Sequence, residues 1–160
     1  MDRQLLSKIL AQMRKNLREG KDIGDMKVGA LLALGHQLEA IFYYLGHELG
    51  TILKVKQVKD ISQIPEELQR IISEFNLGSV EITESTNEII QLKLKGHSSI
   101  KDLIKKGIKT TGSFCSFEAG LLAGIVEKLS DRHCFAQELG CSLQSGESFC
   151  EFMIVFQSQD

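Results

Sequence analysis

Several common functional signatures are missing from this sequence of 160 residues. It contains no glycine-rich phosphate loop, no dinucleotide fingerprint, and no serine, histidine and aspartate arranged around a nucleophile elbow. It also contains no CxxC pair, the most recognisable spacing of zinc ligands. The chain therefore does not resemble a nucleotide-dependent enzyme or a serine hydrolase, and a metal site would have to use other spacings.

The sequence has neither a strong excess of one charge nor a long apolar run. It carries 19 basic and 21 acidic residues, so no global field draws the protein to nucleic acid or to an anionic membrane. No apolar run reaches the ~20 residues that span a bilayer, and residues 1–20 mix charges throughout, unlike a signal peptide. With 42% hydrophobic residues, we expect one cytoplasmic domain over residues 1–160 that buries a sizeable core without disulfides.

The first 50 residues predict two helices. Residues 1–19 form an amphipathic pattern, whereas residues 30–49 are apolar nearly all round and are expected to be buried on most sides. The apolar stripe of the first helix suggests a homodimer interface, at which it would face a second copy of the chain. That stripe consists of Leu6, Ile9, Leu10, Met13 and Leu17.

Residues 52–109 predict a hairpin flanked by short helices. The only proline opens a helix over Pro65–Phe75, and the first turn is a favourable place for a proline. Apolar and polar residues alternate over residues 79–83 and 88–95, which predicts a hairpin in a sheet with one solvent-exposed face. Residues 52–58 fit either a short strand or the frayed end of a helix, and residues 100–108 fit a short basic helix or a turn.

The last third predicts one helix and a second hairpin. Apolar residues recur at helical spacing over Cys115–Leu129. Two apolar runs, Gln137–Leu143 and Phe149–Phe156, flank a turn at Ser145 and Gly146, as in an antiparallel pair with a tight loop. The order of elements predicts an α+β fold, in which an antiparallel sheet of four or more strands packs against several helices on one face.

Three cysteines and a glutamate can meet within this predicted unit. If the loop has two residues, Cys141 and Cys150 face each other with Cβ atoms ~4.5 to 5.5 Å apart. Glu138 lies three residues before Cys141, and a bulge at Gly140 would return the two side chains to one face. Cys115 opens the predicted helix, where the helix dipole favours a thiolate. Three thiolates and a carboxylate suit a closed, tetrahedral zinc site that holds structure rather than catalysing.

Other interpretations of the cysteines stay open on the sequence alone. Free cysteines are often buried and can simply fill the core. Cys141 and Cys150 can instead form a cross-strand disulfide in an oxidising compartment. Cys134, next to His133, is a further candidate ligand, which we interpret as a bystander on the preceding strand.

Other polar residues and glycines are expected to have structural roles. Glu118 and Glu127 are predicted to be exposed carboxylates on the helix that Cys115 opens. His97 stands in a polar turn without a partner near it in sequence. Gly120 and Gly124 share one helix face and permit close contact with another element.

The C-terminal half resembles the 4-vinyl reductase domain family. The resemblance rests on the run CSFEAGLLAGI from Cys115, on ELGC from Glu138, and on Gly146 followed by CEF from Cys150. These small ligand-binding domains are related to the sensor domains of aromatic-responsive transcription activators. They are related more distantly to vesicle-tethering subunits that hold an acyl chain.

The resemblance implies a ligand set for the metal. In the aromatic-sensing members, zinc is held by three cysteines and a glutamate, which map here onto Cys115, Glu138, Cys141 and Cys150. The last two cysteines are slightly further apart than in those sensors, so the loop between them is expected to have a different shape. Residues 110–157 are accordingly expected to be the metal-binding core, and residues 1–50 a helical part that dimerises.

The resemblance also implies an apolar pocket near the metal for a small hydrophobic molecule. Tyr43 is a fair polar anchor, because a buried tyrosine hydroxyl needs a partner. All the lining candidates are residue types that more often serve as plain core. They are Phe42, Tyr43, Phe117, Leu121, Phe152 and Ile154.

Together these features predict a zinc-stabilised binding domain that senses or sequesters a small hydrophobic or aromatic molecule without turnover. One alternative is a reductase acting on a vinyl group of a tetrapyrrole-like substrate, although the chain shows no nicotinamide or flavin motif. Another is an assembly protein that works through its N-terminal helices.

Overall fold

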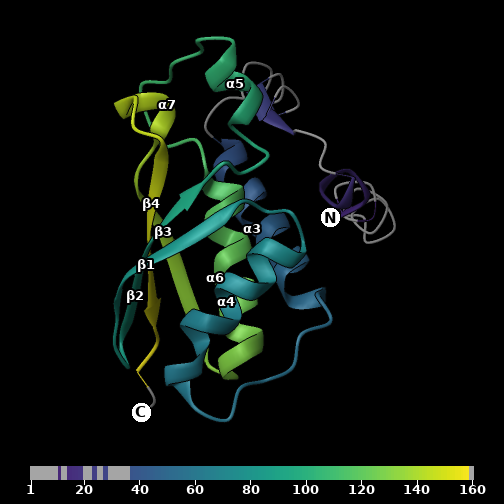
Figure 1. Ribbon diagram of the computed structural model, residues 1–160, viewed down its shortest axis with the longest axis vertical. Helices are drawn as coiled ribbons and strands as arrows, with labels where there is room; N and C mark the ends of the chain where they lie inside the picture. The colour runs from purple at the N-terminus through teal and green to yellow at the C-terminus, as the bar shows by residue number, and fades with distance from the viewer. Residues whose placement is uncertain (1–10, 12–13, 20–22, 25–26, 29–36, 159–160) are drawn as a thin grey trace.

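The computed structural model describes residues 11, 14–19, 23–24, 27–28 and 37–158. Within that part of the chain the helices are α3 (Gln37–Ile52), α4 (Ile64–Glu74), α5 (Lys101–Lys105), α6 (Ser116–Ser130) and α7 (Ser142–Ser145), with a 3-10 turn η1 (Ile61–Gln63) before α4. The strands are β1 (Ser79–Ser85), β2 (Ile89–Lys95), β3 (Cys134–Gly140) and β4 (Phe149–Phe156). The predicted α+β fold with an antiparallel sheet is confirmed (Figure 1).

The sheet has the order β1-β2-β4-β3, and each neighbouring pair is antiparallel. Alternate residues of the two central strands are buried, among them Ile90 and Leu92 on β2 and Phe152 and Ile154 on β4. Since successive side chains of a strand point to opposite faces, one face of the sheet carries the core. The one-sided alternation predicted for residues 88–95 is confirmed.

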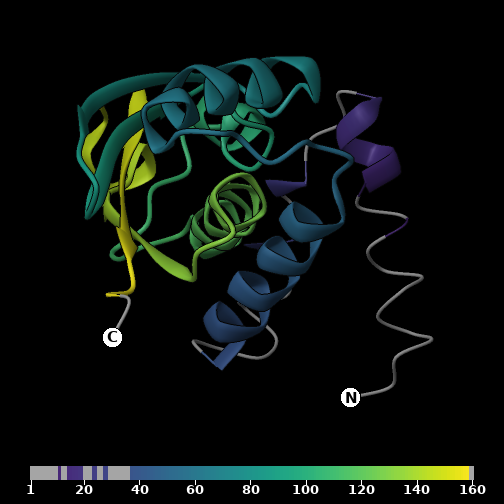
Figure 2. The same cartoon turned by 90° about the horizontal axis from the view of Figure 1, so that it is seen from below.

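The long helices form two layers against that face of the sheet. Figure 2 shows α6 against the sheet and α3 on the far side of α6, while α4 lies beside α6 and contacts β1. The short helices α5 and α7 lie at one end of the molecule, near the beginning of α6 (Figure 1). The start of α6 therefore sits where the sheet, α5 and α7 come together.

Glycines let α3 and α6 approach each other closely. A Cβ atom added to Gly120 would lie 1.9 Å from the carbonyl oxygen of Tyr43, and one added to Gly46 would lie 2.0 Å from that of Phe117. Gly124 is equally constrained, because its added Cβ would lie 2.3 Å from a carbonyl oxygen of α3. The predicted role of Gly120 and Gly124 in close packing is confirmed.

The N-terminal predictions fall largely outside the described residues. In the predicted dimer stripe, Leu6, Ile9, Leu10 and Met13 lie outside them. Leu17 lies inside and is 4% exposed, buried in the core of its own chain. The second predicted helix is represented by α3, which extends to Ile52 rather than ending at Leu49.

The segment after α3 is neither of the two elements weighed for it. Residues 54–58 have no regular secondary structure. The backbone N–H of Val58 donates a hydrogen bond of 2.9 Å to the carbonyl of Leu129, near the end of α6. The segment is therefore an irregular connection tied to α6, which its short alternating pattern did not distinguish from a strand.

The predicted two-residue turn between the last strands is wrong. Residues Ser142–Ser145 form α7, and Gly146 caps it with a φ of 80°. The backbone N–H groups of Gln144 and Ser145 donate to the carbonyl of Cys141 at 3.0 and 2.9 Å, which closes a helical turn where a hairpin loop was expected. Cys141 consequently stands at the N-cap of α7 instead of within a strand.

Candidate metal centre

A bulge at the end of β3 sets the direction of two candidate ligands. The register of β3 against β4 shifts between Glu138, which faces Phe152, and Gly140, which faces Glu151. One residue, Leu139, is thus inserted, as the odd spacing of Glu138 and Cys141 predicted. Gly140 is not among the described glycines with positive φ, so the bulge forms without the left-handed conformation that was expected.

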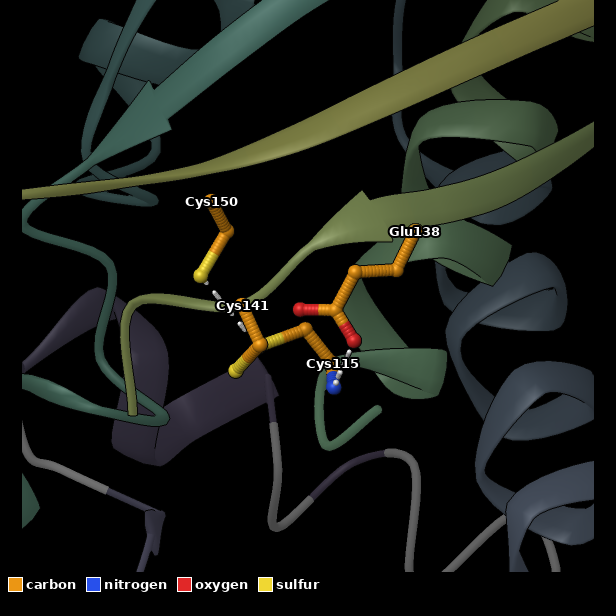
Figure 3. A group of neighbouring side chains, drawn as sticks. All are labelled: Cys115, Glu138, Cys141 and Cys150. Carbon is orange, nitrogen blue, oxygen red and sulfur yellow. Dashed lines mark hydrogen bonds between the residues drawn. The ribbon is translucent and has the colours of Figure 1, made fainter. Parts of the chain in front are cut away.

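The four predicted ligands lie together in a buried cluster, hereafter the thiol cluster. One ligand atom from each of Cys115, Glu138, Cys141 and Cys150 lies within 4.8 Å of the others, and all four residues are buried. The Sγ atom of Cys115 is 4.0 Å from that of Cys141 and 3.7 Å from that of Cys150. Figure 3 shows the side chains converging from the start of α6, the end of β3, the N-cap of α7 and β4.

The carboxylate of Glu138 is held by one oxygen only. Its Oε2 atom accepts hydrogen bonds from the backbone N–H groups of Phe114 at 2.9 Å and Cys115 at 3.0 Å. Its Oε1 atom is buried and has no hydrogen-bond partner among the described residues. Buried polar atoms are nearly always satisfied, so this oxygen beside three thiols is placed where it could bind a cation.

The pKa values of the cluster residues are also consistent with a cation site. Burial raises the pKa of the Glu138 carboxyl to about 7, and the neighbouring charge on Cys141 adds to the effect. Burial also raises the pKa of the Cys115 thiol well above its ordinary value. The pKa of Cys141 is lowered, because Cys115 and Cys150 donate hydrogen bonds to its thiolate. Without a cation the cluster accommodates little negative charge, whereas a divalent ion would stabilise all four ligands as anions.

Cys134 lies apart from the thiol cluster, as expected of a bystander. Its thiol donates to the carbonyl of Ala123 on α6 at 3.4 Å, and burial raises its pKa to about 12. All four cysteines are free thiols in this structure.

Glu118 is buried, and the prediction that it is an exposed carboxylate is wrong. It is 4% exposed and forms an ion pair with Lys27, whose Nζ atom lies 2.9 Å from Oε2. Ser99 donates its hydroxyl to Oε1. Burial on its own would raise the pKa of Glu118, but the charge of Lys27 and the hydrogen bonds from Ser99 and Lys27 together lower it below the ordinary value. The partners lie 91 and 19 residues away in sequence, too far for any local pattern to reveal them.

His97 joins this ion pair to the thiol cluster. Its Nε2 atom lies 3.5 Å from Sγ of Cys150 and 3.8 Å from Sγ of Cys115, and its Nδ1 atom lies 3.6 Å from Glu118. The ring is 1% exposed, and burial lowers its pKa to about 4, against the opposing charge of Glu118. The histidine is therefore neutral, and no signal in its polar turn indicated this position.

His97, Cys115 and Glu118 form a second group whose ligand atoms lie close together. This group suits a metal less well than the thiol cluster, because the oxygens of Glu118 already accept from Lys27 and Ser99. The free oxygen of Glu138 has no such competitor among the described residues.

Glu127 is also less exposed than predicted. One of its oxygens accepts from the backbone N–H of Cys134 at 3.0 Å, and the other lies 3.0 Å from Nε2 of His47. These contacts tie β3 and α3 to α6, so the residue has a structural role at the partly buried edge of the sheet.

Two small cavities lie among the helices, and His97 connects the first of them to the thiol cluster. The first has a volume of about 10 Å³, space for about one water molecule, and is bordered by Phe117, Leu121 and Leu122 of α6 and by His97 and Glu118. The second, also of about 10 Å³, lies between α3, α4 and residues 14–18. Leu17, Leu77 and Leu121 border both.

The six predicted pocket residues divide between cavity and core. Phe117 and Leu121 border the first cavity. The other four border neither of these two cavities; they are Phe42, Tyr43, Phe152 and Ile154. Tyr43 is half-buried, and its hydroxyl accepts a hydrogen bond from the backbone N–H of Ala136 at 3.1 Å, while its ring stacks on Phe135. The polar partner expected for its hydroxyl is thus a backbone N–H group of β3, the strand at the edge of the sheet.

The described part of the chain contains no helix long and apolar enough to cross a bilayer.

Comparisons with known proteins identify sequence relatives but no family model that matches. The protein MJ0150 of Methanocaldococcus jannaschii, described as uncharacterized, is 28% identical over 134 residues, which are 84% of this chain and 73% of that protein. The uncharacterized MJ1642 of the same organism is 32% identical over 122 residues, or 76% of this chain and 66% of that protein. Each relative is longer than the part that this chain matches.

Solved structures share the fold at low sequence identity. A vinyl-4-reductase family protein from Methanocaldococcus jannaschii superposes with a TM-score of 0.61 at 23% identity, covering 99% of this chain and 98% of that one. The phenol-responsive sensory domain of the transcription activator PoxR, solved with phenol, gives 0.62 at 15%, covering 84% and 72%. A trafficking protein particle complex subunit 3 from Naegleria fowleri, covalently bound to palmitic acid, gives 0.55 at 12%, covering 97% and 92%. The resemblance that the C-terminal motifs indicate is confirmed at the level of the fold.

Proposed function

We propose that this chain, which has the fold of a vinyl-4-reductase family protein, is a zinc-stabilised domain that binds a small hydrophobic or aromatic molecule and senses or sequesters it without turnover. The observation that carries the proposal is the buried Oε1 atom of Glu138, which lies beside three buried thiols and has no hydrogen-bond partner in the described part of the chain. A small, largely apolar cavity bordered by His97, which lies 3.5 Å from Cys150, supports the binding of an apolar molecule close to the cluster.

Zinc would be held by Cys115, Glu138, Cys141 and Cys150. Three soft thiolates and one carboxylate fill a tetrahedral coordination shell, so such an ion supplies structure rather than a reactive water. The four residues come from the N-cap of α6, from β3, from the N-cap of α7 and from β4. Their ligation would therefore tie the helical layer to the sheet, and its free energy would contribute to folding.

The position of His97 supports a link between the metal and a bound molecule. The histidine borders the first cavity and also lies 3.5 Å from Cys150. A molecule in this cavity would contact a side chain that contacts a metal ligand, and groups of this kind orient metal ligands. Two proteins with the same fold were solved with phenol and with palmitic acid, both largely apolar.

We further propose that the protein is cytoplasmic and forms a homodimer through its N-terminal helix. A reducing compartment would keep the four free cysteines available to a metal. Replacing Leu10 by Glu tests the dimer by size-exclusion chromatography with light scattering. A dimeric parent and a monomeric variant are expected, and an unchanged mass for the variant would remove this interface.

The proposal is tested by native mass spectrometry of the purified protein, repeated after denaturation. We expect the folded protein to carry the mass of one zinc ion and of an organic molecule, and both to be lost on unfolding. A folded chain that carries neither mass, even after incubation with zinc, would overturn the proposal. Incubation with reduced nicotinamide and tetrapyrrole pigments separates binding from reduction, because a binder shifts the pigment spectrum without forming product.

A further inference from the structure

The turn between β2 and α5 brings together parts of the chain that are distant in sequence. His97, in this turn, is 1% exposed and lies against the thiol cluster. The carbonyl of Ser98 accepts a hydrogen bond from the backbone N–H of Ile23 at 3.0 Å. The hydroxyl of Ser99 donates to Glu118 on α6. Consecutive residues of the turn are thus held by different segments, which fixes the position of the His97 ring.

His97 faces two of the candidate zinc ligands through one ring nitrogen. Its Nε2 atom lies 3.5 Å from Sγ of Cys150 and 3.8 Å from Sγ of Cys115. The sulfur of Cys150 also accepts the backbone N–H of Ser142 at 3.3 Å. This sulfur is therefore the member of the thiol cluster that both a backbone nitrogen and a side-chain nitrogen approach.

A bound metal would decide which ring nitrogen carries the proton. A thiol can donate its S–H to Nε2, but a metal-bound thiolate has no proton left to donate. In the loaded protein a lone pair on Nε2 would face two anionic sulfurs, whereas an N–H group there would donate to them. The other nitrogen, Nδ1, is 3.6 Å from Glu118 and has no hydrogen-bond partner among the described residues. A proton on Nδ1 would therefore gain less than a proton on Nε2.

A donor at this position would also offset the charge of the metal centre. Three thiolates and a carboxylate carry two more charges than a zinc ion neutralises, and all four ligand residues are buried. Hydrogen bonds to a charged acceptor are stronger than those between neutral groups. Lys27 is buried nearby, but its ammonium group pairs with Glu118. The imidazole of His97 is consequently the side-chain donor in contact with the sulfurs.

We propose that His97 is a positioning residue of the metal centre. In the zinc-loaded protein its Nε2–H group donates to the thiolate of Cys150 and holds this ligand, and with it β4, toward Cys115 at the start of α6. The inference rests on the proposed function, since it assumes that the thiol cluster binds zinc. Groups that orient metal ligands typically contribute about 10- to 100-fold to metal affinity, so loss of the donor should be measurable in zinc binding itself.

Two substitutions separate the donor from the bulk of the side chain. H97Q keeps an N–H donor on a side chain that can reach the position of Nε2, whereas H97M is of similar size and has no donor. H47M is the matched control, because His47 contacts Glu127 outside the thiol cluster. Competition with a chromogenic chelator measures the zinc affinity of the parent and the three variants, and thermal melting verifies that each is folded.

H97M is expected to bind zinc at least about tenfold more weakly than the parent, while H97Q and H47M stay close to it. Equal affinities of H97M and the parent would overturn the positioning role, and so would a loss in H97Q as large as that in H97M. Either result would leave the proposed zinc site standing. A parent that binds no zinc would instead overturn the proposed function, and this inference with it.

Nitrogen-15 NMR of the zinc-loaded parent locates the proton directly, including where H97M does not fold. The two ring nitrogens of each histidine are distinguished by their couplings to the ring protons, and the signals of His97 are those that are absent from H97Q. Nε2 is expected to be protonated. An unprotonated Nε2 would overturn the proposal, because a purely structural histidine has no need of a proton directed at sulfur.

Discussion

The carboxylate of Glu138 holds the backbone at the start of α6, because its Oε2 atom accepts the N–H group of Cys115 at 3.0 Å. The other oxygen, Oε1, is buried beside the three thiols and has no partner among the described residues. One side chain therefore both positions the first cysteine and offers an oxygen to a cation. The predictions about the metal follow from these separate roles of the two carboxylate oxygens.

Replacing Glu138 with Gln should weaken zinc binding at least tenfold. The amide retains the size of the side chain but removes the negative charge that the proposed ion would neutralise. Competition with a chromogenic chelator measures the affinity, and E151Q is the control, since Glu151 faces Gly140 on the neighbouring strand outside the thiol cluster. Equal zinc affinity of E138Q and the parent would exclude Glu138 as a ligand.

Replacing Cys141 with Ser should remove about one equivalent of zinc and lower the free energy of unfolding by roughly 3–5 kcal/mol, as expected when a structural metal is lost. The matched control is C134S, because Cys134 is buried but bonds to Ala123 outside the cluster. Elemental analysis and urea unfolding measure the two quantities. A C141S protein that keeps its zinc and its stability would show that the ligand set is wrong.

Replacing Lys27 with Met should destabilise the protein by roughly 3–5 kcal/mol, because Glu118 would be left as an unpaired buried charge. The K27M/E118Q double variant should recover much of this loss, since it buries no charge. Urea unfolding of the parent, both single variants and the double variant completes a double-mutant cycle. Strictly additive effects would mean that the 2.9 Å contact contributes no coupling.

The same ion pair should shape the pH dependence of stability. The folded-state pKa of Glu118 is below its ordinary 4.5, so its stabilisation is present above that pH and is lost as the pH falls through the folded value. The folded-state pKa of Lys27 is above its ordinary 10.5, so its stabilisation is present below that pH and is lost at higher pH. Unfolding free energies across the pH range should therefore decline less at both extremes in K27M/E118Q. Parallel curves would contradict the assigned charge states.

Replacing Gly120 with Ala should lower the free energy of unfolding by roughly 3 kcal/mol or more, because the added methyl group would overlap the carbonyl oxygen of Tyr43 and push α3 away from α6. The control is G112A, at a position where an added Cβ atom meets nothing within 4 Å. Thermal melting compares the two variants. Similar melting temperatures for G120A and the parent would mean that the helix contact adjusts easily.

The sequence was most informative where the signal is local. Apolar periodicity located α4 and α6 and the β1–β2 hairpin to within a few residues, because helices and half-buried strands repeat with fixed periods. The odd spacing of Glu138 and Cys141 indicated the bulge that the pairing of β3 with β4 places at Leu139. The turn before β4 was missed, because a serine-rich segment suits a short capped helix as well as a hairpin loop.

Tertiary structure decided which polar groups are buried and what they meet. Lys27 and Glu118 are 91 residues apart, and their ion pair exists only because the chain brings the two side chains together in the core. The same packing places His97 beside Cys150. The sequence by itself determined most of the secondary structure and the donor atoms available to a metal, since both depend largely on near neighbours. The partners, the cavities and the charge states depend on burial, which is set by contacts between segments distant in the chain.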